Sequence, residues 1–136
     1  MPVKSTIDPN TGVIVHKATE QLSMPDLRGA LDRITGHPLF QPGANALWDL
    51  SEVTVADVDA KKLRELVGEV CKSIEGRGTG YKVAIVVPRD VDYGVARMYE
   101  AYASELPIEL RVLRSSGDAW EWFSGRSETP DSPQGD

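Results

Sequence analysis

The strongest constraint on the fold is an unbroken apolar segment, Val83-Ala84-Ile85-Val86-Val87, which Pro88 closes. The segment is rich in β-branched residues and does not alternate between apolar and polar side chains. This pattern is typical of a parallel strand that is covered on both faces. A strand over Lys82–Val87 therefore predicts an α/β fold in which this strand lies inside a mostly parallel sheet.

Strand patterns and helix patterns alternate along the rest of the chain. Two β-branched stretches, Val3–Ile7 and Val13–Ala18, flank the turn sequence DPNTG and predict a β-hairpin. Further strands are predicted over Ala44–Leu50 and Ile108–Arg114, the latter at an edge because its alternation is partial. The order ββαβαβαβα predicts a single α/β domain: a mostly parallel mixed sheet of about five strands with an N-terminal hairpin and four helices.

Three longer helices are indicated by apolar residues at helical spacing. The first is predicted to begin after the N-cap Ser23 and to end at Gly36, the second to be capped by Asp57, and the third by Asp90 or Asp92. The predicted buried stripes are Leu27, Ala30, Leu31 and Ile34 in the first helix, Leu63, Leu66, Val67, Val70, Cys71 and Ile74 in the second, and Val95, Met98, Tyr99, Tyr102 and Leu106 in the third.

The C-terminal part combines a short aromatic helix with a polar tail. Ser116 is predicted to cap a helix that carries Trp120, Trp122 and Phe123. A short helix cannot place all three rings on one stripe, so we expect at least one ring to lie over a neighbouring helix or in a subunit contact. The second alternative would make the protein a homodimer. The residues from 125 onward include no apolar side chain, so we expect one domain over 1–124 and a disordered tail over 125–136.

Composition restricts the environment and the partners. A net charge of −6 and a pI near 4.9 argue against nucleic acid as a partner, because phosphate binding needs a Lys/Arg surface. No apolar run approaches the roughly 18 residues of a membrane span, and the N-terminus has no signal-peptide pattern. Cys71 is the only cysteine, so no internal disulfide can form. We therefore expect a cytoplasmic protein with no integral membrane segment.

Two stretches resemble a known family. The sequence LWDLSEVTVADVDAKKL resembles the strand–loop–helix signature of STAS domains, the fold of bacterial anti-sigma factor antagonists. The stretch VAIVVPRDVDYGVARMYEAYASELPIELRVLRSSGDAWEWF is similar to the SpoIIAA-like branch of that fold. The resemblance covers about residues 1 to 124. It implies a non-enzymatic regulatory or binding module whose partner is a protein or a small effector.

The STAS resemblance fails at the phosphorylation site. STAS switches usually read Asp-Ser-Ser-Gly at the helix start, whereas this chain reads Asp57-Val58-Asp59-Ala60. Neither serine hydroxyl exists, so the usual switch is excluded. Asp59 carries less charge and fewer acceptor oxygens than a phosphoserine, and an acid at this place also favours a helix N-terminus.

The same folds are similar in shape to lipid-carrying CRAL-TRIO (Sec14-like) domains. This similarity implies an alternative function, the carriage of an apolar small molecule or lipid. A cavity that faces the helix starts at Asp57 and Tyr93 would favour the carrier, and a flat acidic surface would favour the protein-binding module.

The candidate binding residues follow the third and fourth strands, because ligands of parallel sheets gather beyond the carboxyl ends of the strands. Arg89 and the free N–H groups near Asp92 could hold an anion. Tyr93 stands at the helix start, outside the main apolar stripe, and is the tyrosine most expected to reach a ligand. The predicted binding residues are Asp49, Ser51, Asp57, Asp59, Arg89, Tyr93 and Arg97.

No residue pattern indicates a catalytic set, a metal site or a cofactor. No Ser-His-Asp or Cys-His set can be assembled, and His16 and His37 have no companions at metal-ligand spacing. The sequence GRGTG at 76–80 follows a helix and precedes a strand, the reverse of a dinucleotide-binding fingerprint, and predicts a helix end and turn. Cys71 is expected to be a core residue rather than a nucleophile.

Overall fold

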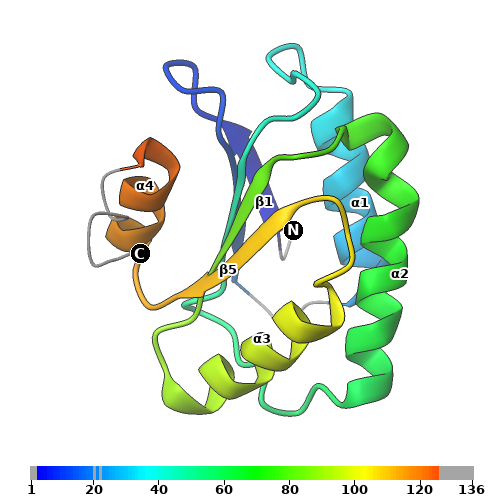
Figure 1. Cartoon of the computed structure of the whole chain (residues 1–136), viewed down its shortest axis with the longest axis vertical. Coiled ribbons are helices and arrows are strands. Elements are labelled where there is room, and N and C mark those ends of the chain that lie inside the picture. Colours follow the sequence, from blue (N-terminus) through cyan, green and yellow to red (C-terminus); the bar gives the residue numbers. More distant parts are fainter. Residues whose placement is uncertain (1–2, 20, 22, 126–136) are drawn as a thin grey trace.

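The computed structural model describes residues 3–19, 21 and 23–125 and shows one five-stranded mixed sheet with four helices (Figure 1). This architecture confirms the predicted fold class. The elements are β1 Val3–Ile7, β2 Ile14–Ala18, α1 Met24–Thr35, β3 Ala46–Asp49, α2 Ala60–Arg77, β4 Lys82–Val86, α3 Asp90–Tyr102, β5 Glu109–Leu113 and α4 Ser116–Ser124.

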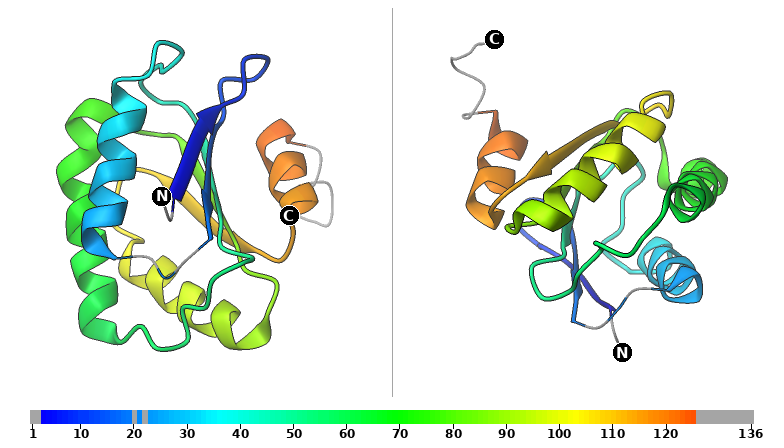
Figure 2. Two further views of the ribbon diagram at one scale, coloured as in Figure 1. Left: turned by 180° about the vertical axis from the view of Figure 1, so that it is seen from behind. Right: turned by 90° about the horizontal axis from the view of Figure 1, so that it is seen from below.

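The strands follow one another across the sheet in chain order, β1-β2-β3-β4-β5. The β1–β2 hairpin is antiparallel and every later pairing is parallel. Crossovers between parallel strands are right-handed, and each new strand here is added on the same side. The crossover helices α1, α2 and α3 therefore share one face of the sheet, and α4 covers the other (Figure 2).

Strand β4 lies inside the sheet between β3 and β5, as the apolar run predicts. Residues from 83 to 87 are all buried. Ala84 and Val86 pack against Trp122 of α4, whereas Val83 and Ile85 face the helices α1–α3. Strand β5 lies at one edge of the sheet and β1 at the other, which agrees with the edge or half-covered position predicted for β5.

Helix α4 places its aromatic rings against the sheet. Trp122 is buried, and Trp120 and Phe123 are partly buried around the same cluster. The guanidinium carbon of Arg111 on β5 lies 4.8 Å from the ring centre of Trp122. The rings thus find their contacts within the chain, and a homodimer stays a prediction. The predicted tail beyond residue 125 lies outside the described residues.

The N-cap of α1 is confirmed, and that of α2 needs a correction. Ser23 and Asp26 form a reciprocal capping box at the start of α1. Helix α2 is capped by Asp59, whose Oδ1 accepts the N–H of Lys62 at 2.9 Å, and not by Asp57. Both residues are aspartates, a favoured N-cap type, and they stand only two positions apart. The residue type therefore does not distinguish between them, and the path of the preceding loop does.

The predicted caps of α3 and α4 are also wrong. Arg89 is the N-cap residue of α3 and makes no side-chain capping bond, because Asp90 and Asp92 bind elsewhere. Helix α4 is capped by Ser115, not Ser116, through a bond from the N–H of Asp118.

Three predicted core residues are exposed. Cys71 lies on the solvent side of α2, and Met98 and Tyr102 of α3 are 45% and 38% exposed. The inward side of α3 and its C-cap carries Asp92, Ala96 and Ala103 beside the predicted Val95 and Tyr99. The buried residue Asp92 belongs to this face, so the buried face of α3 differs from the one that its apolar residues alone predict. None of the helices within the described residues has the length and apolar character needed to cross a bilayer.

Gly78, which follows α2, occupies a position that only glycine fits. Its φ is +93°, and a Cβ would lie 2.7 Å from the backbone nitrogen of Gly43. We expect Gly78→Ala to lower the free energy of unfolding by about 1–3 kcal/mol, measured by urea unfolding. Gly68→Ala is the control, since a Cβ there meets no atom within 4 Å and should stabilise α2. Equal stability of the two variants would contradict this account.

Candidate functional site

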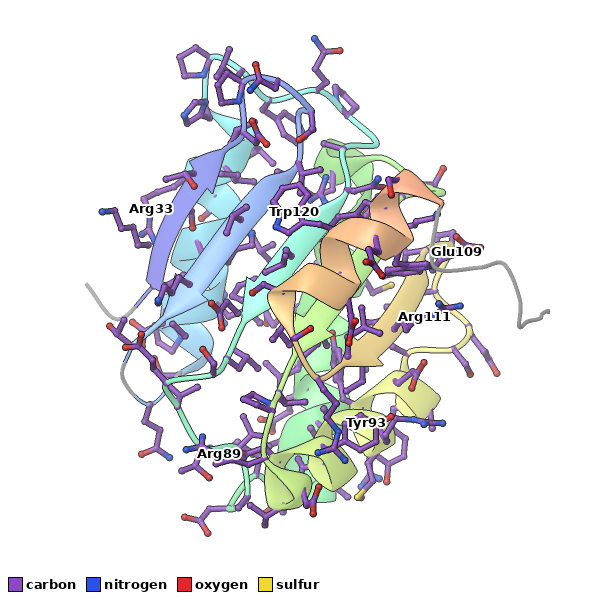
Figure 3. The ribbon with its side chains drawn as sticks, turned by 90° about the vertical axis from the view of Figure 1, so that its left-hand side faces the viewer. Arg33, Arg89, Tyr93, Glu109, Arg111 and Trp120 are labelled. Atoms are coloured by element: carbon purple, nitrogen blue, oxygen red, sulfur yellow. The ribbon has the colours of Figure 1, made fainter. Side chains whose placement is uncertain are left out.

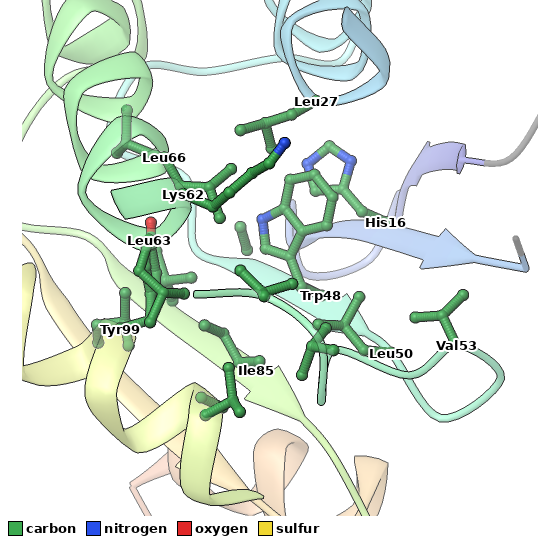
Figure 4. A pocket seen from close by; sticks show the side chains of 18 of the residues that line it. His16, Leu27, Trp48, Leu50, Val53, Lys62, Leu63, Leu66, Ile85 and Tyr99 are labelled. Carbon is green, nitrogen blue, oxygen red and sulfur yellow. The ribbon is translucent and has the colours of Figure 1, made fainter. Parts of the chain in front are cut away.

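A cavity of about 630 Å³ lies between the sheet and the helices α1, α2 and α3 (Figure 4). Pockets that bind small organic ligands measure roughly 300–1,000 Å³, so its size is that of a ligand site. Mainly apolar side chains surround it. The lining residues include Leu27, Leu31, Ala46, Trp48, Leu50, Val53, Leu63, Leu66, Val70, Val83, Ile85, Tyr99 and Leu110.

Two rows of side chains across the sheet form the floor of the cavity. In one row, His16 pairs with Trp48 and Trp48 with Ile85 across adjacent strands. In the other row, Ala46 pairs with Val83 and then Leu110. The period of two along each strand places these residues on the helix-covered face.

Helix α2 forms one wall along its length. Leu63, Leu66 and Val70 line the cavity at helical spacing, and Ser73 and Arg77 continue the same stripe. The exposed lining residues gather at the loops before α1 and after β3 and at the first turns of α1 and α2, and they are Gln21, Ser23, Pro25, Thr54, Asp57 and Lys62. The cavity therefore opens beside the N-terminus of α2 and closes at its C-terminus.

His16 is a buried and neutral member of the floor. It is 1% exposed, and its ring stacks on Trp48 at 4.0 Å between centroids. Its Nδ1 shares a hydrogen bond of 2.7 Å with Oγ of Ser5. Burial lowers the pKa of His16 to about 3, and the charges of Arg77 and Arg33 act in the same direction. The ring therefore carries no charge at neutral pH and acts as an aromatic surface.

Arg77 lies at the closed end of the cavity and is 2% exposed. Its Nη2 donates to the carbonyl of Ala44 at 3.0 Å, and its guanidinium carbon lies 4.0 Å from the ring centre of Tyr81. Nη1 is buried and has no hydrogen-bond partner among the described residues. Burial lowers the pKa of Arg77 and raises that of Tyr81. Arginine nevertheless keeps its proton in proteins, so a buried positive charge borders the cavity.

Asp92 joins the loop after β3 to the start of α3. Its Oδ1 accepts hydrogen bonds from Thr54 Oγ1 and from the N–H of Val55, both at 2.9 Å, and its Oδ2 accepts one from Arg89 Nε at 2.7 Å. Burial alone would raise the pKa of Asp92, but the bonds from Val55, Arg89 and Thr54 hold it below its usual value. Because Val53, Thr54 and Val55 line the cavity, this carboxylate fixes part of its wall.

The predicted binding residues lie near the same edge of the sheet, and all of them except Asp57 have side-chain partners within the chain. Arg89 also donates to the carbonyl of Val53, and Asp49 accepts two bonds from Ser51. Arg97 forms a 2.8 Å ion pair with Glu100.

Tyr93 packs partly buried against the core, and Arg114 lies 4.0 Å from its ring centre. Figure 3 shows Arg89 and Tyr93 at this edge. Asp57 is the one predicted residue that lines the cavity.

Sequence reasoning missed His16, Arg77 and Asp92 as residues of the cavity and its wall. In the sequence, His16 stands out only as a possible metal ligand without companions, and Arg77 only as part of the GRGTG turn. The alternation of the predicted β2 strand was a usable signal, since it places His16 on the same face as Ile14 and Ala18. Among the described residues no His/Cys/Asp/Glu group has the arrangement of a metal site.

Comparison with known proteins gave no matching family model and no significant match to a curated protein or to a solved structure.

Proposed function

We propose that this protein is a non-enzymatic binding protein for an apolar small molecule, which it holds in the cavity between the sheet and the helices α1–α3. The observation that carries the proposal is the cavity itself. A volume of about 630 Å³ is lined mainly by apolar side chains and opens to solvent at one end. Burying apolar surface of a ligand there is favourable by about 25 cal/mol per Å² removed from water.

The titratable groups around the cavity support binding rather than catalysis. General acid–base chemistry at neutral pH needs a group whose pKa lies near that pH. His16 has a pKa of about 3, and burial raises the pKa values of Tyr81 and Tyr99 further above neutrality. These residues therefore keep one protonation state at neutral pH and present rings to a ligand.

The SpoIIAA-like resemblance agrees with this function at the level of architecture. A cavity behind the helix starts is the feature that the comparison with CRAL-TRIO domains implied. The protein-partner version would use the acidic edge, where Asp49 binds Ser51 and Asp59 caps α2. Because these carboxylates have partners within the chain, we favour the small-molecule version.

Filling the cavity is expected to abolish binding. Leu66 lines the middle of the cavity wall, so the larger side chain of Leu66→Trp should occupy the space of a ligand. We expect the affinity for the uncharged dye Nile red, followed by its fluorescence, to fall by about tenfold or more.

The matched control is Glu65→Trp, which adds the same ring to the solvent side of α2. This variant should bind Nile red as the wild type does. Two results would refute the proposal: saturable dye binding that both variants retain equally, or the absence of saturable binding by the wild type.

A further inference from the structure

We propose that the ligand of the cavity is an apolar molecule with a single carboxylate, and that Arg77 binds this carboxylate at the closed end. This inference rests on the proposed function and names the class of ligand. It starts from the unusual position of Arg77, a charged side chain that is almost completely buried beside an apolar space.

The charge of Arg77 has no counterion in the described part of the chain. The ion pairs there involve other residues, and the Tyr81 ring beside the guanidinium carries a hydroxyl that is neutral at neutral pH. Removing a charge from water is costly unless it is paired and hydrogen-bonded. An anion that enters with the ligand would supply the missing partner.

The donor geometry favours a carboxylate. Nη2 is occupied by the carbonyl of Ala44, while Nη1 has no partner. Arginine binds carboxylates through charge-assisted hydrogen bonds that are about twice as strong as neutral ones. One negative charge balances one arginine, whereas a phosphate monoester would bring a charge of about −1.5 to −2. His16 stays neutral and cannot balance the excess.

The shape of the cavity fits an elongated ligand with its head inside. Lys62 stands at the open end and Arg77 at the closed end of the same helix face, and the axis of α2 rises by about 22 Å between them. Leu63, Leu66 and Val70 lie between these cations. Figure 4 shows the side chain of Lys62 extending from α2 in the direction of Leu27, away from Leu66. A carboxylate at the mouth would stay in water and gain little from Lys62, so the buried Arg77 should set the preference.

The test compares dodecanoate, dodecanol and dodecyl phosphate as competitors of Nile red at about pH 8, where the carboxylate is ionised. The wild type should bind dodecanoate about 10- to 100-fold more tightly than dodecanol, and more tightly than dodecyl phosphate. Arg77→Met should reduce this preference to about threefold or less while it still binds dodecanol, because the apolar wall is unchanged. Arg64→Met removes a cation from the outer side of α2, beside Tyr102, and should keep the wild-type preference.

Each outcome decides the inference separately from the proposed function. If no competitor displaces Nile red, the proposed function fails. If dodecanoate and dodecanol bind the wild type equally, or dodecyl phosphate binds more tightly than both, the carboxylate assignment fails and the apolar site stands. If Lys62→Met loses the preference for dodecanoate over dodecanol and Arg77→Met keeps it, the carboxylate does not lie at the closed end, and its placement beside Arg77 fails. Should Arg77→Met not fold, Arg77→Gln keeps a hydrogen-bonding side chain without the charge, and an unchanged preference in that variant would overturn the assignment to Arg77.

Discussion

Replacing Asp92 with alanine is expected to lower the free energy of unfolding by about 2–4 kcal/mol. Asp92 is fully buried and accepts three hydrogen bonds, from Thr54, Val55 and Arg89. The alanine variant leaves the part-buried N–H of Val55 without its acceptor and removes the carboxylate that Arg89 pairs with. Half of the Arg89 side chain is exposed and can regain water, which keeps the cost below that of a fully buried pair. Urea unfolding followed by circular dichroism measures the effect.

Asp90→Ala is the matched control for Asp92→Ala. Asp90 lies two residues before Asp92 at the start of α3. It pairs with Arg114 at 2.7 Å, and its side chain is 94% exposed. Exposed ion pairs contribute little, so this variant should unfold close to the wild-type midpoint. If Asp92→Ala were as stable as Asp90→Ala, the buried carboxylate would not be what joins the loop after β3 to α3.

Acidification is expected to destabilise the protein through His16, by about 2–3 kcal/mol between pH 7 and pH 4.5. The pKa of His16 is lowered from 6.5 in the unfolded chain to about 3 in the folded protein. Below pH 6.5 the unfolded chain therefore binds a proton that the folded protein does not. This contribution to stability is complete above pH 6.5 and declines as the pH falls towards 3.

The contribution of His16 is isolated by comparing the pH slopes of variants. His16→Gln removes the titrating ring and retains a hydrogen-bonding group for Ser5, so its free energy of unfolding should fall less between pH 7 and pH 4.5. His37→Gln removes the other histidine, which lies in the loop after α1, and should keep the wild-type slope. The result that contradicts this account is an identical slope for the wild type and His16→Gln.

The fold could be predicted because its signals are local. The residues at 83–87 are apolar on both faces of the strand, so this strand cannot have a face in solvent. The turn sequence between β1 and β2 indicates an antiparallel hairpin. The sequence signal for a helix N-cap is equally local, but it does not tell which of two nearby residues of a suitable type forms the cap. Asp59 and Ser115 cap their helices, while the equally suitable Asp57 and Ser116 do not.

The cavity could not be predicted, because an apolar helix stripe looks the same whether it packs on a sheet or borders an empty space. Leu63, Leu66 and Val70 were expected on the inner side of α2, and they line the cavity. Arg77 follows them on the same face, but an arginine before a glycine at a helix end usually lies at the surface. In the fold, the rings of Phe40 and Tyr81 lie 5.7 and 4.0 Å from its guanidinium carbon, and the side chain is buried.

The chain-order sheet also explains why the site differs from the predicted edge. Ligands of open α/β sheets gather at a point where the strand order reverses. Here each strand is added on the same side, so the described sheet contains no such reversal. Three helices on one face enclose the space instead, and the loop between β3 and α2, which contains Asp57, forms part of its mouth.

The central claim is that an apolar ligand enters the space between the sheet and the helices α1–α3, and methyl NMR tests this most directly. Dodecanol is titrated into protein with labelled leucine and valine methyl groups. We expect saturable shifts at Leu63, Leu66 and Val70, with little change at Leu113 on the α4 side of the sheet. Shifts confined to the α4 side, or no saturable shift at the cavity methyl groups, would contradict the account.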